Sequence, residues 1–509
     1  MVCQINKIDS NITSLFIAEE ECPKQLPASP VWYGQEPNSY SDFGADISTV
    51  ARSPIDPSRQ RLKGTISGLD AVAGFNTDLT ETNLTRLMQG FCFANAHQDA
   101  CTQPLNGSSI ALTGVDGTEI KYTAAAGLGI FGASDLIKAS GFGVPSNNGL
   151  KKVSDANATG VIVWGSLVTE ATVSVAAKLE RVGHEFAEGD VVATISGGKL
   201  VLTATAGSFT GFGLLAGQWL FLGGDDPATQ LGTNVGFARI EWFDAKTIAF
   251  DLTTFTAVAH TGAAISLRAF WGTVVRNEPL TENIKTRSYQ LQRQLGKDDA
   301  GIQSEYVVGA VPNELTINIP TEDKVNVDLG FIGLDNEQRN GTVGVKAGSY
   351  VPAKGEQAYN TSSDVIRNRM YVIDPTNTQP TALFGYISEG TLEINNNVTA
   401  IKAVGSVGGF DVSVGTFEVG GSVTAFFTNI AAVQAIRNNA DVGFYSITAA
   451  RNAGFLFDIP LMAMSGGQLQ IEADNPINIP IDNNAAKSKF GYTLLTEFFA
   501  YLPTVGMPQ

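Results

Sequence analysis

The chain has 509 residues, of which 43% are hydrophobic and 16% are charged, and it contains 54 glycines. This composition excludes an intrinsically disordered protein, because disorder requires low hydrophobicity together with high net charge, and it favours extensive β-structure or a surface partly covered in an assembly. The formal net charge of −17 disfavours a protein that attracts nucleic acid, since attraction needs a basic surface that displaces counterions from phosphate.

The first 40 residues predict an extended N-terminal arm. Cys22-Pro23 and the run Pro27-Ala28-Ser29-Pro30 disfavour helix in this segment. The chain does not begin with a basic stretch followed by a long apolar one, so no signal peptide is predicted. The most apolar short stretch, residues 213–222, is too short to span a bilayer.

A strand followed by a short helix comes next. Residues 64–78 predict a strand punctuated by glycines. Residues 81–90 predict a helix, with Leu84, Leu87 and Met88 on one stripe and Gly90 at its end. After this unit, the β-rich stretch between residues 102 and 270 has the size of a small independent domain and predicts an insertion.

Beyond the insertion, the pattern of strands returns twice. Residues 316–319 and 324–329 alternate polar and apolar residues around a turn at Pro320 and Thr321, which predicts a sheet with one buried face. Residues 409–428 predict another strand, followed by a helix over 429–438. Its apolar stripe is predicted at Ile430, Val433 and Ile436. The repeated order of strand, short helix and strands predicts two similar β-rich domains in one chain.

These elements predict a mainly β protein with two tandem β-sandwich or β-barrel domains, short flanking helices and an inserted small β-domain. The predicted organisation is an N-terminal arm at 1–40, a first domain formed by 41–102 with 271–345, an insertion at 103–270, a linker at 346–363 and a second domain at 364–509.

Residues that could carry chemistry form no convincing catalytic or metal site. His184-Glu185 begins like a zinc-protease motif, but Glu188 stands where the second histidine is required. Residues 127–132 match G-x-G-x-x-G without the strand, helix and acidic residue of a dinucleotide-binding unit. The sequence therefore predicts a protein that is not an enzyme and that holds no cofactor or metal.

Two segments of the second half resemble a known family. Residues 389–399 read E-G-T-L-E-I-N-N-N-V-T and residues 412–427 read V-S-V-G-T-F-E-V-G-G-S-V-T-A-F-F. They are similar to the tail tube (major tail) protein of long-tailed, non-contractile bacteriophages, in which an I-N-N-N strand precedes a G-S-(aliphatic)-T-A strand and a short helix. Residues 59–64 and 311–320 resemble the other half of that family, so the likeness covers most of 40–100 and 285–505.

The resemblance implies a structural virion protein whose β-sandwich protomers close into rings that stack into a tube. Members with two tandem domains form trimers that imitate a hexamer, so a homotrimer is expected and a homohexamer is the alternative. DNA passes through the channel during ejection without being bound. The implied partners are other copies, a tape-measure protein and a tail terminator protein, with no membrane. The implied location is the virion tail, after assembly in the cytoplasm of the bacterial host.

Acidic residues on the polar side of the strands are the candidates for a channel wall. If the alternation holds, Glu393 and Glu418 in the second copy, and Asp70 and Asp78 in the first, face the DNA. An acidic wall avoids trapping phosphate and so allows fast passage. In the alternative, these side chains face solvent on the outside of the protein.

A second hypothesis is a β-rich carbohydrate-binding or adhesin protein. It requires an exposed aromatic platform, for which Trp219 and Trp242 are the candidates. Because each lies among aliphatic strand residues, packing in a core is the competing interpretation for both tryptophans.

Overall fold

The computed structural model describes residues 10–55, 57–298 and 301–508. Within these ranges the protein is mainly β, with sheets of 17, 12 and two strands and only two α-helices, α1 (Thr85–Phe91) and α2 (Ala431–Arg437). Neither helix is long and apolar enough to cross a membrane. The predicted fold class, mainly β with short flanking helices, is confirmed.

The 17-stranded sheet contains two halves of similar construction. The first half consists of β1 (Ser14–Glu19), β3 (Pro37–Val50), β4 (Thr65–Asp78), β18 (Tyr289–Asp298), β19 (Gly301–Ile319), β20 (Asn326–Gly333) and β21 (Asp335–Arg339). The second half consists of β23 (Val365–Val372), β24 (Ile387–Asn395), β27 (Glu418–Phe426), β28 (Val442–Ala450), β29 (Ala453–Gly466), β30 (Asn478–Ala485) and β31 (Leu495–Phe499).

Six antiparallel pairings occur in both halves, in the same order along the chain. The pairings β1·β18, β3·β4, β4·β20, β18·β19, β19·β20 and β19·β21 recur as β23·β28, β24·β27, β27·β30, β28·β29, β29·β30 and β29·β31. Even an irregularity is repeated, since the bulge between Pro37 and Ser39 in β3 recurs between Ile387 and Glu389 in β24.

The two helices also end in the same way. Phe93 after α1 and Asn439 after α2 have left-handed φ values of 46° and 47°. The next amide, of Ala94 or Ala440, donates back to the carbonyl of Gln89 or Ala435. This is the hydrogen-bond pattern of a Schellman cap. The duplicated order read from the sequence therefore corresponds to a duplication of strand pairing and of helix capping.

The halves meet edge to edge through β19 and β24. Glu314 lies opposite Asn395 and Ile319 lies opposite Gly390 in an antiparallel ladder. The pairings produce one run of eight strands, called here the joint sheet, in the order β3-β4-β20-β19-β24-β27-β30-β29. One face of the joint sheet is packed on the main apolar core, to which both halves contribute, for example with Ile317 and Leu392.

Two other layers cover the outer side of the halves. The first half is covered by β2 (Val31–Gln35), which pairs with β1, and by β22 (Ser349–Val351), which runs parallel to β2. The described part of the N-terminal segment thus folds on its own chain. The second half is covered by the insertion, which shares with it an apolar cluster that includes Trp219, Tyr445 and Phe499.

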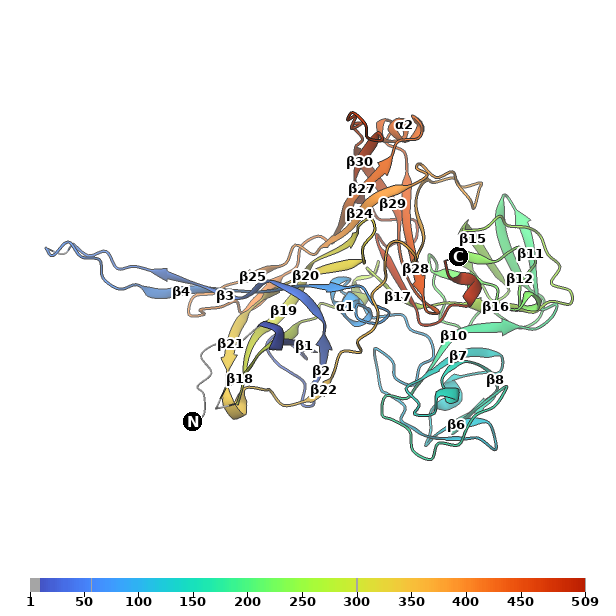
Figure 1. The fold of residues 1–509 in the computed structure, drawn as a ribbon, viewed down its shortest axis with the longest axis horizontal. Helices are drawn as coiled ribbons and strands as arrows, with labels where there is room; N and C mark the ends of the chain where they lie inside the picture. The colour runs from blue at the N-terminus through green and yellow to red at the C-terminus, as the bar shows by residue number, and fades with distance from the viewer. Residues whose placement is uncertain (1–9, 56, 299–300, 509) are drawn as a thin grey trace.

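The insertion, between α1 and β18, forms its own sheet. Its strands are β5 (Leu112–Asp116), β6 (Lys121–Ala124), β7 (Asp135–Ser140), β8 (Gly149–Asn157), β9 (Gly160–Val163), β10 (Lys178–Phe186), β11 (Val191–Ser196), β12 (Lys199–Ala204), β13 (Trp219–Leu222), β14 (Gly236–Phe243), β15 (Thr247–Thr253) and β16 (Leu267–Phe270). It contains two apolar clusters, one within residues 115–179 and one within 186–271, and Figure 1 shows two lobes. The chain returns through β17 (Thr273–Arg276), which pairs with β31.

The loops at the far end of the joint sheet differ between the halves. The hairpin of β3 and β4 extends well beyond the body of the protein (Figure 1). The equivalent loop of the second half, which contains β25 (Thr399–Ile401) and β26 (Asp411–Ser413), folds back on the first half. There the Leu69 amide donates to the Val407 carbonyl over 2.8 Å, and Lys402 Nζ lies 2.6 Å from the Asp70 carboxylate.

Candidate functional site

The face of the joint sheet opposite the core carries polar side chains in rows that cross both halves. Because successive side chains of a strand alternate between faces, every second residue joins these rows. One row contains Asp78, Asn326, Asn318, Thr391, Ser422 and Asp482; a second contains Asn76, Asp328, Thr316, Glu393, Gly420 and Asn484; a third contains Gly74, Gly330, Glu314, Asn395 and Glu418. We call this surface, with Asp70 and Glu389 at its margins, the polar face.

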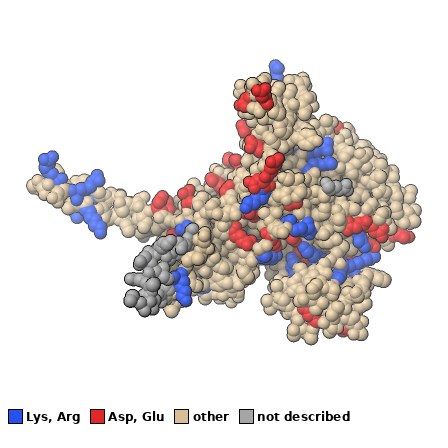
Figure 2. Space-filling view, in the orientation of Figure 1, with Lys and Arg blue, Asp and Glu red and all other residues tan. Residues whose placement is uncertain are grey.

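The polar face is strongly acidic. Its rows and two marginal residues carry eight carboxylates, those of Asp70, Asp78, Glu314, Asp328, Glu389, Glu393, Glu418 and Asp482. Exposed Asp46 of β3 lies beside them, opposite Asp70. Two lysines reach its margin, where Lys402 pairs with Asp70 and Lys324 with Asp78, each over 2.6 Å. Figure 2 shows acidic side chains following the joint sheet from the base of the β3–β4 hairpin toward α2. The surface therefore repels polyanions along its length.

All four acidic residues proposed from the sequence lie on the polar face. Asp70, Glu393 and Glu418 are exposed, and Asp78 is half-buried. The structure thus brings the candidates of both halves onto one surface, because β19 and β24 join the two sheets. Whether that surface lines a channel stays a prediction.

Four further acidic residues were missed by the sequence reasoning, namely Glu314, Asp328, Glu389 and Asp482. The alternation in residues 316–319 and 324–329 contained the signal for two of them. Asp328 stands on the polar side of its strand, between Val327 and Leu329, and Glu314 keeps the polar period of β19. Glu389 and Asp482 follow the same period in β24 and β30.

Asparagine side chains tie neighbouring strands of the polar face together. The Asp328 carboxylate accepts hydrogen bonds from the side-chain amides of Asn76 and Asn318, at 2.7 and 2.9 Å. Asn38 of β3 donates to Asp78 over 2.6 Å. An asparagine amide has two donors and a carbonyl acceptor and so can bridge acceptors on adjacent strands. The acidic side chains of this region are thereby held in fixed positions.

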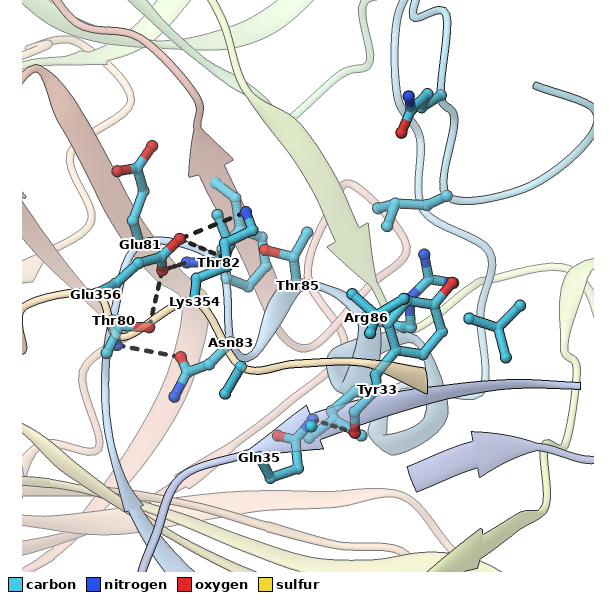
Figure 3. Close-up of a pocket in the computed structure, with 18 of the residues that line it drawn as sticks. Tyr33, Gln35, Thr80, Glu81, Thr82, Asn83, Thr85, Arg86, Lys354 and Glu356 are labelled. Carbon is cyan, nitrogen blue, oxygen red and sulfur yellow. Dashed lines mark hydrogen bonds and ion pairs between the residues drawn. The ribbon is translucent and has the colours of Figure 1, made fainter. Parts of the chain in front are cut away.

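A cavity of about 640 Å³ lies between the N-terminal strands, the start of α1, the segment 351–356 and the insertion. Several of its charged groups are paired (Figure 3): Glu356 accepts from the Thr82 amide at 2.9 Å and hydroxyl at 2.8 Å. Lys138 Nζ lies 2.8 Å from Glu81, and Arg86 stacks on the Tyr33 ring. These contacts connect layers of the fold and leave none of these groups set up as a nucleophile or general base.

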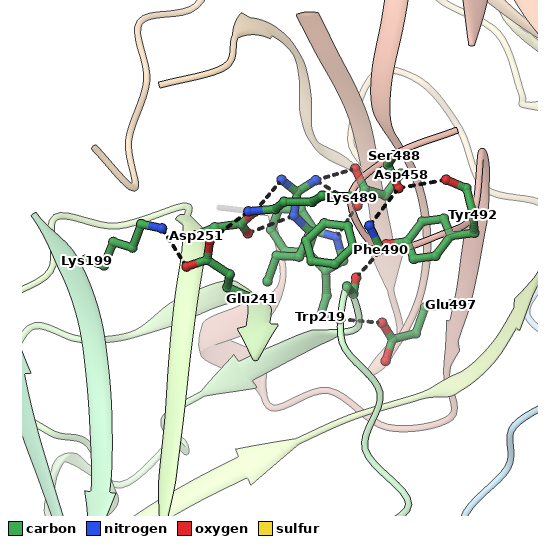
Figure 4. Close-up of polar contacts among 12 residues, drawn as sticks. Lys199, Trp219, Glu241, Asp251, Asp458, Ser488, Lys489, Phe490, Tyr492 and Glu497 are labelled. Atoms are coloured by element: carbon green, nitrogen blue, oxygen red, sulfur yellow. Dashed lines mark hydrogen bonds and ion pairs between the residues drawn. The ribbon is translucent and has the colours of Figure 1, made fainter. Parts of the chain in front are cut away.

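A second cluster of charged groups is buried where the insertion contacts the second half (Figure 4). Arg239 of β14 donates to both oxygens of Asp458 in β29, at 3.1 and 3.0 Å, and to Asp251 through Nε at 2.9 Å. Asp458 also accepts from the Trp219 indole N–H over 3.1 Å. Burial raises the pKa of the Asp458 carboxyl, although Arg239 opposes that shift. The cluster is inaccessible to substrate and joins two layers of the fold.

Glu497 of β31 lies beside this cluster and is fully buried. It accepts hydrogen bonds from the amides of Gly272 and Trp219, at 2.9 and 3.0 Å, and from the Gln218 side chain at 3.1 Å. Burial raises its pKa to about 8, against the lowering effect of these donors. Two carboxylates of the second half are thus covered by donors from the insertion or from the strand connection that follows it.

The remaining sequence motifs lie in structural positions. His184 Nδ1 lies 3.0 Å from Asp135, which also pairs with Arg181 over 3.0 Å. Residues 128–130 form a single 3-10 turn rather than the start of a helix. In the described part of the chain, no three or more His, Cys, Asp or Glu side chains are grouped to hold a metal ion. Trp219 is fully buried whereas Trp242 is 47% exposed, so the two tryptophans do not form one exposed platform.

Comparison with protein families matches most of the chain. A family described as phage tail tube protein has a model that matches residues 10–485. The matched range includes the insertion and all of the joint sheet. No curated protein matches the chain.

Proposed function

The chain belongs to the phage tail tube protein family, and on that premise we propose that it closes into stacked rings whose central channel conducts DNA into the host. Membership of this family gives the chain a structural role in the virion tail. The proposal adds the ring, the channel and the surface that lines it. In the assembled tail, the tube would enclose a tape-measure protein and end at a tail terminator protein, after assembly in the bacterial cytoplasm.

The observation that carries the proposal is the edge-to-edge joint of two equivalent halves. A joint between β19 and β24 uses one edge of each half and leaves β3 and the end of β29 as the outer edges. An exposed sheet edge tends to pair with another chain. Identical subunits that pair head to tail form a ring if the rotation closes, and closing a sheet removes its edges.

The same repeat supports a trimer. Three copies of the eight-stranded joint sheet would contribute 24 strands, from six equivalent halves, and six copies would contribute 48. The diameter of a barrel grows roughly in proportion to its strand number, so the homohexamer would have about twice the bore. We propose the trimer, with tube domains formed by 41–102 with 271–345 and by 364–509.

We propose that the polar face lines the channel and that the core and the insertion lie outside it. Its eight carboxylates support this placement, because a surface that repels phosphate does not hold DNA during passage. The apolar face of the same strands is already packed in the main core. The insertion contacts the second half through the apolar cluster that includes Trp219, Tyr445 and Phe499, and we place it outside the bore.

Electron microscopy of the purified protein tests the ring. Negative-stain images are expected to show rings or tubes with a central hole, because the outer strands can then pair. Monodisperse globules without a bore at all concentrations, including those reached in an infected cell, would contradict the proposal.

Charge reversal tests the wall. In phage carrying Glu393→Lys and Glu418→Lys, tubes are expected to form and DNA ejection to become several-fold slower at low salt, because lysines bind phosphate. The difference is expected to shrink as salt screens the charges. Glu282→Lys, at an exposed position outside the joint sheet, is the matched control. Ejection that is unchanged in the double variant would place both residues outside the channel.

A further inference from the structure

We propose that the joint between copies repeats the joint within the chain, so that residues 465–470 pair antiparallel with residues 41–46 of a second copy. This inference rests on the proposed ring and specifies the surface that closes it. Its basis is the set of strand pairings that the two halves share.

The first partner of the joint follows from comparing β19 with β29. In β19, the stretch from Glu314 to Asn318 has β20 on one side and β24 on the other. The corresponding stretch of the second half begins at Ser465, which lies opposite Asp482 of β30, and runs to Gln470, which bridges to Asn478. In the described residues no strand pairs with the other side of this stretch. It is therefore the unpaired counterpart of the edge that β24 covers.

The second partner follows from comparing β3 with β24. The shared bulge makes Tyr40 and Ser41 the counterparts of residues 390–391 in β24. β3 contains one extra residue between Ser41 and Gly44, so Asp46, which lies opposite Asp70, becomes the counterpart of Asn395, which lies opposite Glu418. Among the described strands, β3 pairs with β4 alone. Its other edge is the counterpart of the β24 edge that contacts β19.

Superposing these correspondences on the observed joint gives the register between copies. Glu314 opposite Asn395 becomes Ser465 opposite Asp46 of the second copy. Asn318, which faces Asn326, corresponds to Gln470, which bridges to Asn478, so Asn318 opposite Thr391 becomes Gln470 opposite Ser41. The rows of the polar face then continue from one copy into the next. In Figure 1, the two edges lie at opposite ends of the joint sheet, as a head-to-tail ring requires.

The two joints differ in strength. Within the chain, Ile317 lies opposite Leu392, and both are buried. Between copies, the equivalent stretch of β29 contains Gly466 and Gly467, both with φ of +78°, and its counterpart in β3 contains Gly44 with φ of +143°. Bulged and irregular edges pair less readily than straight ones. We infer that single chains resist uncontrolled pairing and that ring closure is reversible, whereas the joint within the chain is permanent.

Disulfide trapping tests the register. The double variant Ser465→Cys/Asp46→Cys, with exposed Cys22 replaced by serine, is assembled under reducing conditions, checked for rings by electron microscopy and then oxidised. Directly opposed residues have Cβ atoms about 5 Å apart, close to disulfide geometry. We expect covalent species that end at the closed ring, which for the trimer is a band of three chains in denaturing gels.

A pair outside the register is the control, together with each single variant. Ser465→Cys/Ser39→Cys places the cysteines about six residues apart along the edge, or roughly 20 Å, and is expected to give no covalent rings. Rings that the register pair fails to trap would overturn this inference and leave the proposed function intact. The absence of rings in the unmodified protein would instead overturn the proposed function. Loss of rings in the reduced register pair but not in the control pair would support the joint.

Discussion

The two halves of the joint sheet share their strand pairings but are covered by layers of different chemistry. Tyr306 in β19 and Asp458 in β29 occupy equivalent places, opposite Gln292 and Tyr445 respectively. Tyr306 packs against Trp32, which is covered by Tyr350 at a ring distance of 5.7 Å.

At the equivalent position of the second half, Asp458 pairs with Arg239 of the insertion. One scaffold thus accepts an aromatic cover in the first half and a charged contact in the second. The difference shows which part of the duplicated unit tolerates changes in sequence. The pairings that build the joint sheet are repeated, whereas the outer side is free to change.

A buried ion pair is a weak source of stability compared with apolar packing, but leaving one partner alone is costly. We infer that the Arg239–Asp458 pair fixes where the insertion docks, because no displaced position would satisfy both charges.

Removing one partner of the charged contact is expected to have the largest effect. Arg239→Leu leaves Asp458 buried without its cation, while Asp251 keeps its contact with Lys489 at 3.0 Å. This is expected to lower the free energy of unfolding by about 3–5 kcal/mol. Urea unfolding measures the change. Lys402→Met, which breaks the exposed pair with Asp70, is the matched control, and its effect is expected to be below about 1 kcal/mol. Equal effects of the two variants would show that the buried pair does not hold the insertion in place.

The stability of the contact between the insertion and the second half is also expected to depend on pH, because burial raises the pKa of Glu497 to about 8. Its folded-state pKa lies above the ordinary value of 4.5. The contribution of the protonated Glu497 carboxyl to the free energy of unfolding is therefore fully present below about pH 4.5. It is lost as the pH rises through about 8. The expected loss of unfolding free energy over this range is on the order of a few kcal/mol.

Glu497→Gln isolates this dependence. The variant has no carboxyl to ionise, so its unfolding free energy between pH 6 and 9 is expected to fall less than that of the unmodified protein. The variant also starts from a lower stability, because an amide cannot accept from all three donors. The same slope in both proteins would show that Glu497 does not titrate in this range. The aromatic contact around Trp32 involves no carboxylate and provides the internal comparison.

The smallest effect on stability is expected at the tip of the β3–β4 hairpin. Arg52, Arg59, Arg61 and Lys63 are exposed there, and Figure 2 shows basic side chains at this end of the molecule. In Arg59→Glu/Arg61→Glu, the unfolding free energy is expected to change by less than about 0.5 kcal/mol. Stacked tubes are expected to become shorter at low salt while single rings persist, because other copies present an acidic surface. Tube lengths measured by electron microscopy that match those of the unmodified protein would exclude a stacking role.

Much of the local structure could be predicted from the sequence. The helices expected over 81–90 and 429–438 are observed as Thr85–Phe91 and Ala431–Arg437, and the strands around Pro320 are observed as β19 and β20. The stripe expected in the second helix is only partly right. Ile430 is 54% exposed and precedes the helix as its N-cap, and the buried residues of α2 are Ala432 and Ala435.

The amino-acid sequence by itself determined which side of each strand is polar and that the chain contains two related halves, since both follow from patterns along the chain. Only the tertiary structure decided that β19 pairs with β24, which places Glu393 and Asp328 in one row. It also decided that Asp458, in the apolar stretch of β29, is buried against Arg239. The physical reason is that the period of a strand sets the face on which each side chain lies. The partner and the register depend on residues distant in the chain.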